Sequence, residues 1–277
     1  MSEKIYIYQD SLGLPRFSED LFLEDTLGWQ LMKSFDSRLN FSDTDISLKF
    51  GRNLRSHDKL FKNSLKTSRF LLNKFRLNWL LGNNKKIIFI DSKVHRTTNS
   101  LVQDIPRIIS SKFSSIIIHI GINDCVPRLV SLENRNKISN LPPFLKSKVI
   151  KILHKFRPFL LEYNFSRRHK SAWVSIDKFE KNLLAIKSLC KKANVNLKIV
   201  NISPPNEYLK SRSIGSEHNI LDYNEIIMKS FKEKEIIDIH SLFSKKIEDY
   251  LLPDGHHLTK LGFNQLAEKI SGTVKVD

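Results

Sequence analysis

Three short fragments contain the side chains with which this chain could do chemistry. They are Gln9-Asp10-Ser11-Leu12, Gly121-Ile122-Asn123-Asp124 and Asp254-Gly255-His256-His257. Together they offer a hydroxyl nucleophile, an amide donor for an oxyanion, and an imidazole base with a carboxylate to orient it. Each fragment alone is more typical of a helix cap or a turn. In combination they predict nucleophilic attack on an acyl group.

Predicted strands and helices place these fragments at the ends of secondary-structure elements. Strand-like apolar runs alternate with amphipathic stretches, which is typical of an α/β domain with a mainly parallel sheet. Strands are predicted at 4–9, 46–50, 86–91, 115–120, 196–202 and 236–239, and the clearest helices at 175–193 and 259–270. Because the carboxyl ends of parallel strands open on one edge of a sheet, Ser11 and Asn123 can meet there.

The order and spacing of the fragments resemble one known family. Asp-Ser-Leu after an amino-terminal strand, Gly-x-Asn-Asp after a central strand and Asp-x-x-His before the last helix look like blocks I, III and V of the SGNH (GDSL-type) hydrolases. The match runs from Ile5 to about Ile270. The resemblance implies a flavodoxin-like three-layer α/β/α fold with a parallel sheet of about five strands. Residues 1–277 are expected to form a single domain, because no internal repeat or Gly/Ser linker divides the chain. It also implies esterase, lipase, thioesterase or carbohydrate-deacetylase activity without a metal.

The resemblance implies a role for each matching residue. Ser11 is the expected nucleophile, His257 the base that takes its proton, and Asp254 the carboxylate that orients the imidazole. The backbone N–H groups of Ser11 and Gly51 and the side-chain amide of Asn123 are the expected oxyanion donors. Gly51 matches the family by position alone, because it follows the predicted strand at 46–50.

Two features depart from the simplest form of such a site. Gln9 stands where the family has glycine, at a position that carries no catalytic group. The neighbours His256 and His257 suggest metal ligands, but adjacent residues rarely bind one ion together and no carboxylate-rich set accompanies them. No metal or other cofactor is therefore expected. Asp10 and Asp124 are expected to have structural roles.

Composition bounds the kind of protein that could carry this site. The only cysteines are Cys125 and Cys190, too few for a disulfide framework, so buried free thiols are expected. No apolar run approaches the roughly 18 residues that a membrane span needs. A strand-like run begins at Lys4 and leaves no room for a secretory signal peptide. The chain is therefore expected in the cytoplasm, with contact at the inner face of the membrane left open.

The chain is strongly basic, with a net charge of +17 and an isoelectric point near 9.8. The segment 126–175 holds 11 lysine or arginine residues against two acidic ones, about half of the excess. Apolar residues from Leu145 to Tyr163 recur there at helical spacing with lysines on other faces, which predicts a basic amphipathic helix. We interpret the segment as a helical insertion or lid that docks an anionic membrane or an acidic glycan. The alternative is a helix packed on the domain with a solvated lysine face.

Three classes of function are compatible with these patterns. The first is an ester hydrolase that deacetylates or deacylates a carbohydrate or glycolipid, in the context of surface polysaccharides. The second is an acyltransferase or a lipid-directed acyl hydrolase that uses the same triad. The third is a basic binding module on an inactive hydrolase scaffold. Nucleic acid is not expected as a partner, because no recognised nucleic-acid motif accompanies the basic segments.

Overall fold

The computed structural model describes residues 3–10, 45–50, 77–82, 86–93, 95–157, 159–160 and 172–273 of the chain. Ser11 and Gly51, two of the expected site residues, lie outside these ranges. None of the helices within them is both long enough and apolar enough to cross a membrane.

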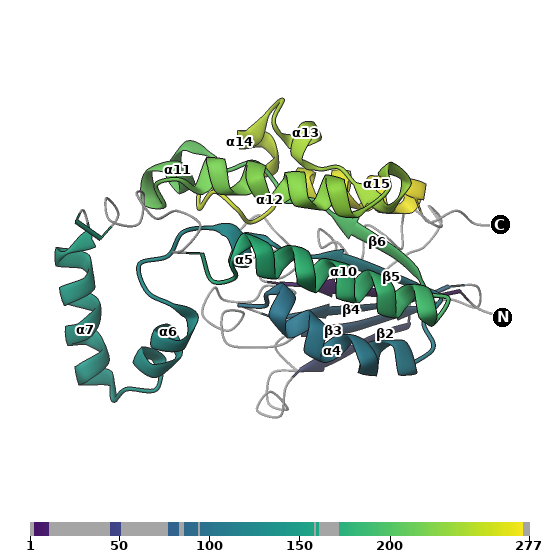
Figure 1. Ribbon diagram of the computed structural model, residues 1–277, viewed down its shortest axis with the longest axis horizontal. Coiled ribbons are helices and arrows are strands. Elements are labelled where there is room, and N and C mark those ends of the chain that lie inside the picture. The colour runs from purple at the N-terminus through teal and green to yellow at the C-terminus, as the bar shows by residue number, and fades with distance from the viewer. Residues whose placement is uncertain are drawn as a thin grey trace.

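A seven-stranded sheet lies at the centre of the fold, in the order β2-β3-β4-β1-β5-β6-β7 (Figure 1). The strands are β1 (Glu3–Gln9), β2 (Asp45–Phe50), β3 (Leu77–Gly82), β4 (Lys86–Ser92), β5 (Ser115–His119), β6 (Asn196–Val200) and β7 (Ile236–Ile237). Neighbours from β4 to β7 in this order pair in parallel, so the predicted parallel sheet of five strands is confirmed. The order of these five strands is that of flavodoxin-like sheets.

Strands β3 and β2 extend the sheet beyond β4 in antiparallel pairing. The predicted strand at 46–50 is present as β2, but it is the outermost strand on that side and joins the sheet through β3. The sequence pattern does not predict β3. In its run Leu-Asn-Trp-Leu-Leu-Gly, apolar and polar residues alternate too little to distinguish a short strand from a helical segment.

The central strands are apolar because both faces of the sheet are covered. Ile7 of β1 lies in register between Ile90 of β4 and Ile117 of β5, and all three are buried. Tyr6 and Tyr8 alternate with Ile7 and therefore lie on the opposite face, where they are also buried. Strands covered on both sides appear in the sequence as nearly continuous apolar runs, which is why they are easy to predict.

The described part of the chain contains ten α-helices, most of which cover the sheet. They are α4 (Thr98–Ser110), α5 (Ile122–Cys125), α6 (Leu132–Ser139), α7 (Pro143–Lys155), α10 (Ile176–Lys192), α11 (Glu207–Arg212), α12 (Ser216–Ser230), α13 (His240–Phe243), α14 (Ile247–Tyr250) and α15 (Lys260–Thr273), with a 3₁₀ turn at Glu233–Glu235. Helix α10 packs between α4 and α12 (Figure 1). Helix α15 contacts β7. The helices predicted at 175–193 and 259–270 are confirmed as α10 and α15.

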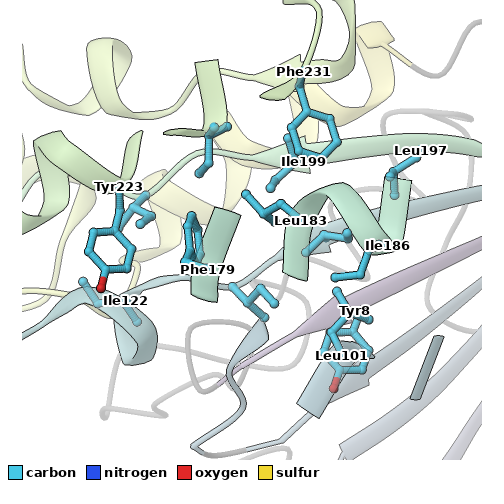
Figure 2. Close-up of a cluster of buried hydrophobic side chains, with 14 of the residues drawn as sticks. Tyr8, Leu101, Ile122, Phe179, Leu183, Ile186, Leu197, Ile199, Tyr223 and Phe231 are labelled. Atoms are coloured by element: carbon cyan, nitrogen blue, oxygen red, sulfur yellow. The ribbon is translucent and has the colours of Figure 1, made fainter. Parts of the chain in front are cut away.

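The core between the sheet and α4, α10 and α12 is built from regularly spaced apolar residues (Figure 2). On α10, Phe179, Leu183 and Ile186 face inward at four- and three-residue spacing. The Phe179 ring lies 4.9 Å from that of Tyr223 on α12, measured between centroids. Cys125 and Cys190 are free and buried, as expected from the sequence.

Helices α6 and α7 stand away from the sheet at one end of the molecule (Figure 1). Neither helix contains a buried residue. The predicted basic amphipathic helix is present as α7, which begins at Pro143, a residue favoured in the first helical turn. The helix ends at Lys155, and a turn follows at Phe156.

Candidate active site

The carboxyl ends of β1 and β5 bring two of the predicted fragments together. β4 pairs with one side of β1 and β5 with the other, and sheets of this type bind ligands where the chain changes sides in this way. Asp10, directly after β1, donates its backbone N–H to the carbonyl of His119 at 3.3 Å. Asn123, in α5, donates from Nδ2 to Oδ2 of Asp10 at 3.3 Å. The first two fragments therefore meet through Asp10 and Asn123.

Three partners fix the orientation of the Asn123 amide. Nη2 of Arg128 donates to Oδ1 of Asn123 at 3.1 Å, which only an oxygen can accept. Nδ2 then faces two acceptors, the Asp10 carboxylate and the carbonyl of Arg96, both at 3.3 Å. The two Nδ2 bonds are long for hydrogen bonds of this kind. Asp10 thus holds Asn123 in place, in agreement with the structural role expected for it.

Gly121 allows β5 to turn directly into α5. Its φ of +135° is a conformation that residues with side chains rarely adopt. A Cβ at this position would also lie 2.7 Å from Cγ1 of Ile202, which follows β6. Gly121 therefore has a conformational role, since it allows the turn that places Asn123 at the edge of the sheet.

Asp124 joins α5 to the start of α4. Its Oδ1 accepts hydrogen bonds from the backbone N–H and the hydroxyl of Thr98, at 2.8 and 2.6 Å. Its Oδ2 is buried without a hydrogen-bond partner in the described part of the chain. Burial raises the pKa of Asp124 to about 7, although the bonds from Thr98 oppose the shift. The expected structural role of Asp124 agrees with these contacts.

The raised pKa of Asp124 predicts a pH-dependent stability. Between its ordinary value of 3.8 and about 7, folded Asp124 holds a proton that the unfolded chain has released. The free energy of unfolding should therefore fall as pH rises through this window, by at most about 1.4 kcal/mol per pH unit. Asp124→Asn keeps the acceptor for Thr98 and removes the titration. Urea unfolding at several pH values between these limits should show a flatter profile for the variant, and parallel profiles would contradict the prediction.

The third fragment forms a hydrogen-bonded pair of carboxylate and imidazole. Oδ2 of Asp254 lies 2.8 Å from Nδ1 of His257, whose side chain is only 2% exposed. The other oxygen, Oδ1, accepts the backbone N–H of His257 at 3.1 Å and fixes the carboxylate plane. Burial favours a raised pKa for Asp254, but the hydrogen bond and charge of His257 outweigh it and hold the pKa well below its usual range. Asp254 is therefore a carboxylate that orients the imidazole through Nδ1.

Gly255 seats this fragment at the same edge of the sheet. Its φ is +85°, and a Cβ there would lie 2.2 Å from Oδ1 of Asn206 and 2.7 Å from Cβ of Leu209. Asn206 caps α11, the helix that follows β6, through a bond to the Leu209 N–H. The close packing of the Asp254–His257 turn on α11 therefore requires glycine at position 255.

His256 differs from its neighbour in its contacts. Its Nδ1 lies 3.1 Å from the backbone carbonyl of Asp254 and 3.7 Å from the carboxylate, so it lacks the short carboxylate bond of His257. Burial, the charge of His257 and, further, that of Arg128 lower the pKa of His256 to about 3. Arg128, which bonds Asn123, is thus among the charges that keep His256 neutral.

Asp254, His256 and His257 also offer three potential metal-ligand atoms within 4.8 Å of one another. Two ligands of one tetrahedral zinc ion lie about 3.3 Å apart, because each is about 2.0 Å from the metal. The 2.8 Å between Nδ1 of His257 and Oδ2 of Asp254 is a hydrogen-bond length. The geometry thus favours an acid–base pair.

Gln9 fills the place of the family's glycine with a buried, hydrogen-bonded side chain. Its Oε1 accepts from the Ser92 hydroxyl at 3.1 Å, and its Nε2 lies 3.2 Å from Nδ1 of His119. Burial lowers the pKa of His119 to about 4, so this imidazole stays neutral near pH 7 and can accept from Gln9. The substitution links β1, β4 and β5 beneath the site.

The sheet fixes the place of the end of β2, the strand before Gly51. Phe50, at the end of β2, is in register with Leu77, which pairs with Ser92, which pairs with Gln9. Three strand spacings, about 14 Å, therefore separate the ends of β2 and β1. The strand next to β1 on this side is β4, and the segment after it supplies the Arg96 carbonyl to Asn123.

Arg96 is a buried part of the site's foundation that the sequence patterns do not reveal. Its Nη2 lies 2.8 Å from Oδ2 of Asp91, and its Nη1 donates to the carbonyls of Asp91 and Gln9. The guanidinium lies 3.8 Å from the ring centroid of Tyr8. Arg96 therefore holds the ends of β1 and β4 together beneath Asn123. Only three-dimensional pairing singles it out among 46 lysine and arginine residues.

A cationic cluster borders the site next to Asn123. The guanidinium carbons of Arg128 and Arg135 lie 4.9 and 5.3 Å from the ring centroid of Trp173. The His95 ring meets Trp173 edge-on at 5.8 Å. Burial, then the charges of Arg135 and Arg128, lower the pKa of His95 to about 4. The only sequence signal for this cluster is the basic character of 126–175, which does not identify Arg128.

No protein-family model matches this sequence, and no curated protein matches it. Solved structures do match in fold. A lipase/acylhydrolase from Enterococcus faecalis has 11% identity and a TM-score of 0.53, over 97% of this chain and 93% of that chain. An acetylxylan esterase from Geobacillus stearothermophilus has 12% identity and a TM-score of 0.53, over 99% and 95%. A protein assigned to the G-D-S-L lipolytic family from Desulfitobacterium hafniense has 11% identity and a TM-score of 0.50, over 99% and 100%.

The fold is therefore that of the SGNH (GDSL-type) hydrolases, as the sequence resemblance implies. At identities of 11 and 12%, the likeness concerns the fold alone.

Proposed function

We propose that the protein is a serine ester hydrolase of the SGNH type that removes acetyl or another acyl group from a carbohydrate or glycolipid. The observation that carries the proposal is the 2.8 Å pair of Asp254 and His257. Packing of Gly255 on α11, the helix that follows β6, supports a place for this pair at the sheet edge that holds Asn123. An imidazole with a carboxylate on Nδ1 has Nε2 as its proton acceptor, as a base for a hydroxyl nucleophile requires.

Ser11 is the proposed nucleophile, because it directly follows Asp10 at the end of β1. In the proposed reaction, His257 takes the hydroxyl proton while the Ser11 oxygen bonds to the ester carbonyl carbon. The proton then passes to the leaving alcohol, and the acyl group stays on Ser11. Water, activated by the same imidazole, adds to the acyl carbon and releases the acid and free Ser11. Asp254 stabilises the imidazolium during both the acylation and the deacylation of Ser11.

Asn123 is the proposed side-chain donor to the oxyanion, together with the backbone N–H group of Ser11. Its two Nδ2 bonds, both at 3.3 Å, go to Asp10 and the Arg96 carbonyl. Both bonds are longer than usual, so a shorter, charge-assisted bond from Nδ2 to a developing oxyanion can replace either of them. Ser11 enters this proposal from the sequence alone. The role of Gly51 stays a prediction from the sequence, because β3 and β4 separate the end of β2 from the end of β1.

The surroundings of the site support an alcohol portion that carries negative charge. Arg128 bonds directly to Asn123, and Arg135 shares the Trp173 ring with it. Two cationic groups at the rim raise the local concentration of an anionic substrate. An acyl ester of an acidic carbohydrate offers both the ester bond to be cleaved and the negative charge that the two arginines attract.

The proposal is tested with a panel of acetylated sugars and longer acyl esters, assayed with wild-type and Ser11→Ala protein. We expect hydrolysis by the wild type alone, and labelling by a fluorophosphonate that disappears in Ser11→Ala. Product that forms only when a sugar acceptor is present would identify an acyltransferase instead. If the wild type shows no hydrolysis and no labelling, the catalytic proposal is refuted and a basic binding module remains.

The oxyanion role of Asn123 makes a separate prediction. Asn123→Ala should lower kcat by about 10²–10³-fold with little change in KM, because the lost bond forms only in the transition state. The exposed Asn136 on α6 provides the control variant Asn136→Ala. Thermal unfolding of both proteins checks that losing the contacts to Asp10 and Arg128 leaves the fold intact. Unchanged turnover in folded Asn123→Ala would remove Asn123 from the oxyanion hole.

A further inference from the structure

Exposed apolar side chains concentrate on α7 and the turn that follows it. Of the 11 large apolar residues exposed in the described part of the chain, six are found there: Phe144, Leu145, Ile150, Ile152, Phe156 and Phe159. Exposure reaches 56% at Ile152 and 69% at Phe159. Leu145, Ile152 and Phe156 follow one another at seven- and four-residue spacing, so they lie along one face. The other five are divided among four helices, which is normal for single surface residues.

The same segment is entirely cationic in its charged residues. Residues 140–160 contain four lysines and one arginine and no acidic residue. Lys148, Lys151 and Lys155 follow at three- and four-residue spacing, so they form a basic row along the helix beside the apolar face. Lysines in this arrangement can extend their ammonium groups past an apolar surface to anionic groups.

The segment is attached next to the candidate active site. Nη2 of Arg157, in the helical turn after α7, donates to the carbonyl of Arg212 at the end of α11, at 3.1 Å. Leu209 of α11 in turn packs against Gly255, within the Asp254–His257 fragment. A surface that binds α7 would therefore lie near the site.

The chemistry of this face selects among three possible partners. A second copy of the chain would bring together two segments of like charge on two molecules of net charge +17, which opposes association. An acidic polysaccharide would pair with the lysines and leave the phenylalanine and isoleucine side chains in water. An anionic lipid bilayer satisfies both parts, because apolar side chains enter the boundary below the headgroups while lysines reach the phosphates.

We propose that α7 and the turn after it dock the protein on the surface of an anionic lipid bilayer. Ile152, Phe156 and Phe159 enter the headgroup boundary, and Lys148, Lys151 and Lys155 contact anionic headgroups. Docking requires no catalytic step, so it stands apart from ester hydrolysis. It would bring the site to esters carried on, or held close to, the membrane.

The test is sedimentation of the full-length protein with vesicles of phosphatidylcholine, with and without about 30 mol % phosphatidylglycerol. The apolar variant is Ile152→Asn/Phe156→Asn, and the charge variant is Lys148→Gln/Lys151→Gln/Lys155→Gln. Matched controls are Leu221→Asn/Met228→Asn on α12, at 51 and 54% exposure, and Lys181→Gln/Lys191→Gln/Lys192→Gln on α10. Circular dichroism checks the fold, which should persist because α7 contains no buried residue.

We expect the wild type and both controls to bind anionic vesicles, more weakly at about 0.5 M salt because added ions screen the lysines. Each α7 variant should bind anionic vesicles at least about tenfold more weakly than the wild type. Absence of wild-type binding, or equal binding by the α7 variants and their controls, would overturn the proposal. So would an apolar variant that binds normally while the charge variant loses binding to both vesicles and a soluble acidic polysaccharide. These outcomes are independent of hydrolysis, since Ser11→Ala protein should bind vesicles like the wild type.

Discussion

Replacing Asp254 with asparagine is expected to lower kcat/KM for ester hydrolysis by about 10⁴-fold while the protein stays folded. The reason is the tautomer of His257. Oδ1 of residue 254 would still accept the His257 backbone N–H at 3.1 Å, so the new amide nitrogen would face Nδ1 of the imidazole. Nδ1 would then accept a hydrogen bond and the ring hydrogen would move to Nε2. The nitrogen that should take the proton of Ser11 would already carry one.

The measurement is steady-state hydrolysis of the best ester from the panel. Asp249→Asn supplies the control, because Asp249 lies in the same region, is 51% exposed and has only a 4.0 Å pairing with Lys246. The control should retain wild-type kcat/KM. A folded Asp254→Asn protein with activity within tenfold of wild type would show that His257 does not depend on this carboxylate, and the proposed triad would be wrong.

The general position of this site is predictable from the sequence because it depends on strand ends. Asp10 and Asn123 follow apolar runs that become β1 and β5, and the sheet order brings those two ends together. The pairing of Asp254 with His257 is local, over three residues, so spacing alone indicates it. Fragments near strand ends and within single turns are therefore visible in one sequence.

Other parts of the site depend on contacts that no local pattern contains. Arg128 reaches Asn123 and the Trp173 ring from a loop, and nothing in its neighbourhood separates it from the other basic residues of 126–175. Strand β3 lies between β2 and the parallel part of the sheet that begins at β4, and pairs antiparallel with both neighbours. The predicted role of Gly51 depends on the place of β2 in this strand order. Strand order is set by long-range packing, which sequence spacing does not specify.

The buried network under the site is the clearest case of such hidden pairing. Asp91 is fully buried, and its Oδ2 accepts from the Tyr6 hydroxyl at 2.5 Å and from Nη2 of Arg96 at 2.8 Å. Burial and the charge of Asp91 raise the pKa of Tyr6 well above its usual range, so the phenol stays protonated as a donor. In the sequence, Asp91 appears only as the polar end of an apolar strand.

Asp91→Asn should therefore lower the free energy of unfolding by about 3–5 kcal/mol, because it leaves the Arg96 guanidinium buried without its charge partner. Asp104, 3.7 Å from Nη2 of Arg96, is the nearest replacement and would bring the loss toward the lower value. Glu133→Gln breaks a pair with Lys137 of similar length, 2.6 Å, but with side chains 76 and 68% exposed. Solvent-exposed pairs contribute at most about 0.5 kcal/mol in helices, so the control should unfold like the wild type in urea.

The same substitution separates stability from the orientation of Asn123. Arg96 accepts from Nδ2 of Asn123 through its backbone carbonyl, while its guanidinium holds the ends of β1 and β4. If Arg96 only stabilises the fold, hydrolysis by the folded fraction of Asp91→Asn should keep the wild-type kcat. If it also positions the oxyanion donor, kcat should fall below that value in the direction seen for Asn123→Ala. A loss of unfolding free energy no larger than that of Glu133→Gln would contradict the network itself, because a buried arginine left without its carboxylate has to be costly.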